Sequence, residues 1–436
     1  VNQIRWSVFA PQGFFSRPSV AFRGDASAAG AHPIRRSLTA MRDRLFNPAF
    51  VLVSVANLLQ VMAFFLFVHL PGYLSDLGAD EIQIGIVIGI AAFASILLRP
   101  LVGREMDRRG RRPVILAGNV VNVVAVSLYL LVDSLGPFLY VVRALHGIGE
   151  ATLFTALSTY AADVIPVSRR NQGLALFGVS GMIPLALGSL TGDLLLRLGD
   201  YDLLFTVAAG FAAAALIASL PLSEPLVEGG GVRTSHPLHI TLRRAALLPL
   251  WWLTVVFAIA IAGYFTFIKT YIAEIGAGSV GAFFASYAGM AVLLRLVAGW
   301  LPDRYGPNRV LFPALGLLAA GFVVLALSPT AGGVVTAGLL CGAGHAYVFP
   351  ILFTQVVTRA DAAERGTAMA IYTGLYDVGT LAGGPALGAI IATAGYPVMF
   401  GAAAVLVVVG TIVFGRWDRG RGIPGPRRPE RVRPPR

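Results

Sequence analysis

Apolar residues fill most of the chain in long runs, and these runs predict its architecture. Each is about 20 residues long, the length that an α-helix needs to cross the hydrocarbon core of a bilayer. They predict twelve membrane-spanning helices, at residues 48–72, 82–102, 113–132, 137–162, 171–193, 202–220, 249–272, 281–301, 310–328, 333–357, 367–391 and 397–415. We therefore expect an all-α polytopic membrane protein.

Positively charged residues are distributed unevenly between the short loops. The loops after spans 2, 4, 6, 8 and 10 hold fourteen arginines, whereas the other loops hold only Arg197 and Lys269. Basic loops stay on the cytoplasmic side of a membrane. We therefore expect a multi-pass protein of the cell (inner) membrane, with both termini in the cytoplasm.

The two halves of the chain resemble each other. The residues Arg99, Gly103, Asp107, Arg108 and Gly110 recur 196 positions later as Arg295, Gly299, Asp303, Arg304 and Gly306. Repeats in the same orientation predict two pseudo-symmetric six-helix halves around an axis along the membrane normal, with a solute site between them. The predicted parts are a cytoplasmic tail 1–47, a half 48–220, a cytoplasmic linker 221–248, a half 249–415 and a basic tail 416–436.

The amino-acid composition supports a membrane protein over a soluble one. Charged residues make up 13% of the chain, about half the roughly 25% of soluble domains. A net charge of +12 would indicate nucleic acid in a soluble protein, but fifteen of the 33 arginines lie in the two tails, so we expect no nucleic-acid partner. A single cysteine, Cys341, excludes an internal disulfide. Met41 directly precedes the first span, so we expect translation to begin there and residues 1–40 to be an over-extended start.

Three local patterns carry a resemblance to a known family. The loop between spans 2 and 3 reads Gly-x-x-x-Asp-Arg-x-Gly-Arg-Arg, at Gly103, Asp107, Arg108, Gly110, Arg111 and Arg112. Span 4 carries a second pattern, at Leu139, Arg143, Gly147, Gly149 and Ala151. His146 and Glu150 stand at positions where this pattern has a Gln and an Ala. Span 5 matches a third pattern only in part. The pattern joins a Gly directly to a Pro, whereas here Gly181 is separated from Pro184, and Gly188 and Gly192 follow at helical spacing.

These patterns resemble the major facilitator superfamily of secondary transporters, over residues 42–416. The resemblance implies twelve helices and alternating access by rocking of one half against the other. It also implies that ion pairs of the loop between spans 2 and 3 close the cytoplasmic side. Asp163 is a candidate partner for the loop arginines, and Asp303 and Arg304 are the repeated copy. The alternative is that the arginines only fix topology.

Span 4 contains the most informative polar residues. Arg143, His146 and Glu150, with Phe154, share one helical stripe that we expect to face the cavity. A charge at the centre of a membrane helix costs about 2.5–3.5 kcal/mol, so such residues are functional candidates. We predict that Glu150, with its repeat counterpart His345, couples protons and sets substrate polarity. The alternative is that Glu150 pairs with Arg143 or His146 and only stabilises the helix.

Other polar residues are candidates for the cavity wall. Asn57 and Gln60 could bind a solute or another helix. The remaining candidates are Tyr264 in span 7, and Tyr372, Tyr376 and the proton-coupling candidate Asp377 in span 11. Arg99 and Arg295 lie near the cytoplasmic face, where their repetition is compatible with gating. His146 and Glu150 lack a third ligand, so we expect no metal.

The chain has no Gly-x-x-x-x-Gly-Lys-Ser/Thr stretch, so ATP does not drive it and a gradient must. We predict a monomeric, cofactor-free transporter of small organic solutes that works by proton-coupled efflux. The interrupted span 5 pattern favours proton-coupled uptake instead. A membrane enzyme or a passive channel is a more distant alternative, because neither clustered catalytic groups nor repeated polar rings are found.

Overall fold

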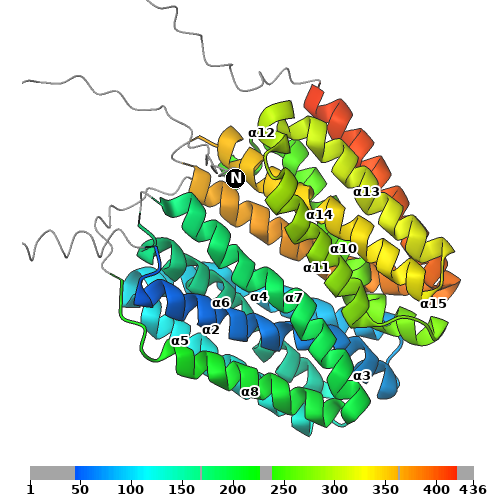
Figure 1. The fold of residues 1–436 in the computed structure, drawn as a ribbon, viewed down its shortest axis with the longest axis horizontal. Helices are drawn as coiled ribbons and strands as arrows, with labels where there is room; N and C mark the ends of the chain where they lie inside the picture. Colours follow the sequence, from blue (N-terminus) through cyan, green and yellow to red (C-terminus); the bar gives the residue numbers. More distant parts are fainter. Residues whose placement is uncertain (1–44, 167–168, 226–237, 362–363, 420–436) are drawn as a thin grey trace, which may run out of the picture. The chain divides into compact units, whose positions relative to one another are not determined.

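A computed structural model describes residues 45–166, 169–225, 238–361 and 364–419. The regular elements of these residues are helices (Figure 1). They are α2 (Pro48–Leu66), η1 (Phe67–His69), α3 (Leu70–Asp76), α4 (Glu81–Arg109), α5 (Arg111–Leu128), η2 (Tyr129–Leu131), α6 (Pro137–Val164), α7 (Arg170–Leu198), α8 (Tyr201–Ser219), α9 (Leu238–Leu242), α10 (Leu248–Ile275), α11 (Val280–Ala298), α12 (Leu301–Tyr305), α13 (Pro307–Leu327), α14 (Ala331–Arg359) and α15 (Arg365–Arg419).

Local side-chain chemistry sets where these helices begin. The first turn of a helix has N–H groups without intrahelical partners, which short polar side chains satisfy. Asp80 accepts from the Gln83 N–H in a capping box that starts α4. Asp200 caps α8, Ser279 caps α11 and Thr330 caps α14 in the same way.

The element α15 contains two helices joined at Gly395. This glycine has φ 81° and ψ 172°, a conformation that interrupts the helix and favours a residue without a Cβ. Tyr396, directly after it, packs on Tyr271 near the end of α10, whereas Asp418 binds Arg359 at the end of α14. The chain therefore doubles back at Gly395, as expected between spans 11 and 12.

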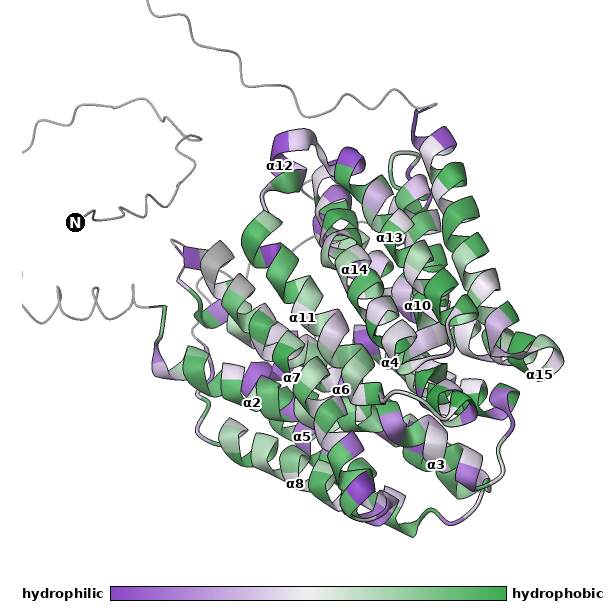
Figure 2. Cartoon of the chain, turned by 45° about the vertical axis from the view of Figure 1, so that its right-hand side comes forward, coloured by the Kyte–Doolittle hydropathy of each residue, from purple (hydrophilic) through white to green (hydrophobic). Residues whose placement is uncertain are grey.

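Ten helices of the described residues are long and apolar enough to cross a membrane. Figure 2 shows hydrophobic residues along their lengths, with hydrophilic residues gathered around α12 and other helix ends. The helix α6 has 28 residues but is not among the ten, because Arg143, His146 and Glu150 lower the hydropathy of its middle. With α6 and the two limbs of α15, the structure is consistent with the predicted twelve crossings and confirms the all-α class.

Helices α2–α8 form one group and α10–α15 another, called here the N half and the C half (Figure 1). The halves meet mainly along two pairs of helices, α4 with α15 and α7 with α11. A Cβ on Gly85 would lie 2.5 Å from the backbone of Gly384, and a Cβ on Gly281 would lie 2.8 Å from the Cα of Leu190. Gly85 and Gly281 are 196 residues apart, so the sequence repeat appears in the two interfaces.

We predict that Gly85→Ala weakens the contact between the halves, because the added methyl group collides with the Gly384 backbone rather than with a movable side chain. Thermal unfolding of the purified protein should show a lower midpoint. Gly374→Ala is the matched control, since a Cβ there meets no atom within 4 Å. It should gain about 0.5–1 kcal/mol from helix propensity. Equal midpoints for the two variants would contradict the tight interface.

Candidate functional site

The three polar residues of α6 form a connected chain. An Arg143 Nη1 atom lies 3.3 Å from His146 Nδ1, and His146 Nε2 lies 2.9 Å from Glu150 Oε1. A guanidinium only donates, so His146 Nδ1 accepts and the imidazole proton lies on Nε2, facing Glu150. The Oε1 atom of Glu150 is outside hydrogen-bond geometry and has no other partner among the described atoms.

The linked side chains of Arg143, His146 and Glu150 do not all face a cavity, contrary to the expectation that the whole stripe would do so. The side chain of His146 is packed 4.4 Å from the ring of Phe67 and 5.6 Å from that of Tyr129, between ring centroids. Arg143 is also buried, whereas Glu150 is 15% and Phe154 61% exposed. The aromatic pocket of the N half takes up the first turn of the stripe, so Glu150 is its accessible end.

His345 lies in an aromatic cluster of the C half. Its ring is 5.3 Å from Phe257, 5.6 Å from Tyr287 and 5.8 Å from the nearly parallel ring of Phe349. The buried Nδ1 atom has no hydrogen-bond partner within the described ranges. In those ranges no hydrogen bond or ion pair joins His345 to Glu150, so the two predicted partners stand apart in this conformation.

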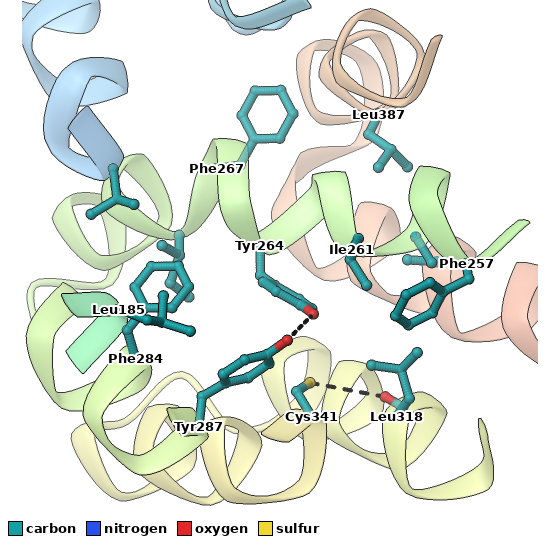
Figure 3. Close-up of a cluster of buried hydrophobic side chains, with 14 of the residues drawn as sticks. Leu185, Phe257, Ile261, Tyr264, Phe267, Phe284, Tyr287, Leu318, Cys341 and Leu387 are labelled. Carbon is teal, nitrogen blue, oxygen red and sulfur yellow. Dashed lines mark hydrogen bonds between the residues drawn. The ribbon is translucent and has the colours of Figure 1, made fainter. Parts of the chain in front are cut away.

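The three candidate tyrosines belong to the C half. The hydroxyls of Tyr264 and Tyr287 are 3.3 Å apart inside the apolar cluster drawn in Figure 3. Tyr372 is also fully buried and donates to the Phe349 carbonyl at 3.4 Å. Tyr376 packs on Phe349 and Phe257 and is only partly buried. Of the three, Tyr376 is placed best to reach a solute.

Asn57 and Gln60 bind neighbouring helices. The Asn57 amide donates to Ser180 Oγ at 2.9 Å, which links α2 to α7. The Gln60 carbonyl accepts from the Asn122 amide at 2.9 Å, which links α2 to α5. Both side chains are buried. The geometry therefore favours the helix-packing alternative over direct solute binding.

Asp377 forms an ion pair between the halves. Its Oδ2 atom accepts from Arg99 Nη2 at 2.6 Å and from Ser95 Oγ at 3.1 Å. Arg99 lies 18 residues after Glu81, about 27 Å along α4. At the related interface the guanidinium of Arg295 meets Met182, 195 residues before Asp377, instead of a carboxylate. The sequence repeat pointed to Arg99 and Arg295 as candidates. No local sequence pattern could pair Arg99 with Asp377, which lies 278 positions away.

The charged loop after α4 is tied within the N half. Of the loop arginines, Arg111 contacts Asp163, with 2.9 Å between Nε and Oδ2. Glu224 accepts from the N–H groups of Arg111 and Arg112, at 2.6 and 2.9 Å, and so caps α5. Glu224 was not predicted, because it falls in the linker. Gly110 has φ 92°, which allows the turn between α4 and α5.

Other predicted gate residues are more exposed. Asp107 is 82% exposed and only 3.9 Å from an Arg111 nitrogen, and Arg108 is exposed next to it. Gly103 faces open space. Arg304 lies over the ring of Trp300 at 5.4 Å, and neither Arg304 nor the exposed Asp303 forms an ion pair within the described residues.

The C half has its own charged network at the same end. Arg244 donates to both carboxylate oxygens of Glu364 at 2.7 Å and also to Asp361. The hydrogen bonds that Arg244 donates to Glu364 raise the pKa of Arg244 above its usual value, and the charge of Asp361 adds to this effect. Arg359 binds Asp418 at 2.6 Å. Each half therefore satisfies its own charges here.

Comparisons with known proteins agree with this architecture. The sequence model of the Major Facilitator Superfamily matches residues 50–384 and 274–435. The chain is 27% identical to the uncharacterized MFS-type transporter YhhS of Escherichia coli, over 80% of this chain and 86% of that protein. It is 24% identical to the staphylopine export protein of Staphylococcus aureus, over 79% of this chain and 88% of that protein.

Solved structures share the fold. A crystal structure of the nucleoside transporter NupG superposes with a TM-score of 0.69 at 13% identity, covering 85% of this chain and 98% of that one. A peptide transporter POT superposes with a TM-score of 0.72 at 16% identity, covering 89% of this chain and 99% of that one.

We predict that Asp377→Asn and Arg99→Gln each destabilise the contact between α4 and α15, because each leaves a largely buried group without its charged partner. Thermal unfolding of the two variants should show lower midpoints than the parent chain. The exchanged pair, Arg99→Asp with Asp377→Arg, should recover most of the loss. Failure of the exchange to recover any stability would contradict a direct interaction.

Proposed function

The chain belongs to the Major Facilitator Superfamily, and we propose that it exports small organic solutes by alternating access in exchange for protons. In this proposal the N and C halves rock against each other around a solute site between them. The end that carries the loop after α4, called here the basic end, faces the cytoplasm.

The observation that carries the rocking mechanism is the uneven distribution of contacts between the halves. At the end opposite the basic end, Gly85 packs on Gly384 and the Gly281 N–H binds Asp193. At the basic end, the networks of Arg111, Arg244 and Arg359 each stay within one half or its linker. A protein built in this way can separate at the basic end with these networks intact, so that Arg99–Asp377 is the charged pair of the described residues that must part.

Glu150 supports proton coupling. It is the accessible end of the Arg143–His146–Glu150 chain, and its Oε1 atom lacks a hydrogen-bond partner. Glu150 is the acidic group among these three residues, and we propose that it takes up a proton from the solute site when the transporter is empty. That proton would accompany the solute-free return step, which couples protons to solute export. His345 would contact the solute from the C half.

Export is supported by the likeness to the staphylopine export protein. Uptake is the second candidate, because Gly181 and Pro184 stand apart where the exporter pattern of the family joins them. The two solved structures with a similar fold are a nucleoside transporter and a peptide transporter. Both solutes are polar organic molecules, which supports a solute of this kind but does not identify it.

We predict that Glu150→Gln abolishes coupling but not exchange. In proteoliposomes, a panel of nucleosides, short peptides and organic acids identifies a solute by counterflow, and a trapped pH dye reports proton movement. The variant should keep solute counterflow within about threefold, a difference below 1 kcal/mol, while solute-dependent proton movement disappears. Glu150→Asp should retain part of the proton movement. Unchanged proton movement in Glu150→Gln would exclude Glu150 as the coupling residue.

We predict that Asp107→Asn impairs transport without destabilising the conformation described here, because Asp107 is mostly exposed and its ion pair with Arg111 is long, at 3.9 Å. Its role would lie in the opposite conformation, in which the basic end closes. Glu105→Gln is the matched control, since Glu105 pairs with Arg109 on the same helix at 2.6 Å. Transport should fall in the first variant only, at equal unfolding midpoints. Retained transport in Asp107→Asn would reduce the loop to a topology signal.

A further inference from the structure

Among the residues that the structure describes, a carboxylate of α7 joins the halves at the end opposite the basic end. Asp193 lies near the end of α7, and its Oδ2 atom accepts from the main-chain N–H of Gly281 at 2.6 Å. Gly281 is the second residue of α11, whose first-turn N–H groups have no intrahelical partners and carry partial positive charge. The contact therefore depends on the negative charge of Asp193.

A buried histidine holds this carboxylate. His69 is fully buried, and its Nε2 atom lies 3.0 Å from Asp193 Oδ1. Its Nδ1 atom lies 3.3 Å from the Leu66 carbonyl oxygen. Both ring nitrogens thus face acceptors, whereas a neutral imidazole has only one N–H. The closed arrangement is satisfied fully only when His69 carries two N–H groups and a positive charge.

The packing of α7 makes room for this ring. A Cβ on Gly192 would lie 2.5 Å from His69 Nδ1, and a Cβ on Gly188 would lie 2.9 Å from the Cβ of Phe65. The two glycines are four residues apart and therefore share one face of α7. The glycine pattern of span 5 thus serves the approach of α2 and η1 to α7, with His69 at its outer end.

Few other charges lie near His69. The helices whose backbones pack against η1 are α2, α3, α7 and α10. In addition, α6 reaches η1 through His146, which packs on Phe67. The helix α2 has no charged residue, and α3 adds Tyr73 and Asp76 beyond the ring. On α7, Arg197 is exposed one turn after Asp193; on α10, Lys269 packs on Gly72, one turn after His69. Within the described residues, Asp193 is the charged group that His69 contacts.

The related interface has no such group. The counterpart of Asp193, 195 residues later, is Gly388, which packs on the backbone of Glu81, and the counterpart of Gly281 is Gly85. At α4 and α15 the halves meet there through glycines, which do not titrate. The His69–Asp193 contact therefore has no counterpart at α4 and α15, although other titratable groups, Glu81 and Glu274 among them, lie at this end.

We propose that His69 and Asp193 form a proton-binding site whose occupancy closes the end opposite the basic end. In the open conformation water reaches His69, and a proton from that side binds its free ring nitrogen. The imidazolium then holds Asp193, whose second oxygen binds the Gly281 N–H and brings α11 onto α7. This inference rests on the proposed alternating access, but not on the role of Glu150 or on the identity of the solute.

The test measures the distance across that end in the full chain in lipid nanodiscs. Leu198 and Leu327, exposed at the ends of α7 and α13, are changed to cysteine and spin-labelled in a Cys341→Ala background. Double electron–electron resonance is recorded at pH 5.5 and pH 8.5. Because closure is proposed to require a proton, the ratio of long to short distances should be higher at pH 8.5 than at pH 5.5.

Three variants test which residues produce the pH response. His69→Gln still donates one hydrogen bond to Asp193 but takes up no proton, so its distances should be equal at the two pH values. Asp193→Asn should give the long distance at both. Asp200→Asn is the matched control, because Asp200 caps α8 within the N half, and it should behave like the parent chain.

A parent chain whose distances do not change with pH overturns the proposal, and so does His69→Gln with a retained response. If His69→Gln does not fold, Asp193→Asn decides, because a retained pH response there is equally contradictory. The response should survive Glu150→Gln in the same labelled chain. A pH response that is lost in Glu150→Gln would refute the His69 site and leave the proposed function standing. A pH response that persists in a protein that transports no solute would support the His69 site and refute the proposed function.

Discussion

Polar groups inside a bilayer must find their partners within the protein, since the hydrocarbon supplies none. The two halves meet this constraint separately. In the N half, His146 lies against Arg143 and Glu150, and Asn122 binds Gln60. In the C half, the Tyr264 and Tyr287 hydroxyls bind each other. Because each half satisfies most of its own polar groups, parting of the halves breaks few charged contacts, among them Arg99–Asp377.

The few polar contacts that cross between the halves therefore carry special weight. Arg99 with Asp377 joins α4 to α15, and Asp193 with the Gly281 N–H joins α7 to α11. They lie at different depths, one about two thirds along α4 and the other near the opposite end. Between them the interfaces consist of close glycine packing, which holds the surfaces in register but resists separation only weakly. We propose that these two charged contacts determine which conformation is stable.

The fold could be predicted from the sequence because its signals are periodic and local. Apolar runs gave the helices, arginine-rich loops gave an expected orientation, and five repeated residues gave the two halves. The predicted gap between the last two spans, residues 392–396, contains Gly395, where the structure interrupts the helix. The match to the Major Facilitator Superfamily and the similar solved structures confirm this class of protein.

The candidate site could be predicted only in part. The spacing of Arg143, His146 and Glu150 indicated their proximity, but not that Phe67 and Tyr129 enclose His146. The partners of Asp377 and Asp193 lie on other helices, far along the chain, and no periodicity reports such pairs. Glu224 was missed for the same reason, since capping of α5 depends on where the chain returns after α8.

We propose that the two ends of the molecule open alternately, and paired distance measurements across both ends are the sharpest test. Labels at Leu198 and Leu327 report one end, and labels at Arg109 and Tyr305 report the basic end. Opposite changes are expected, so that solute or pH conditions that lengthen one distance shorten the other. Distances that lengthen together, or that stay fixed while solute is transported, would contradict it.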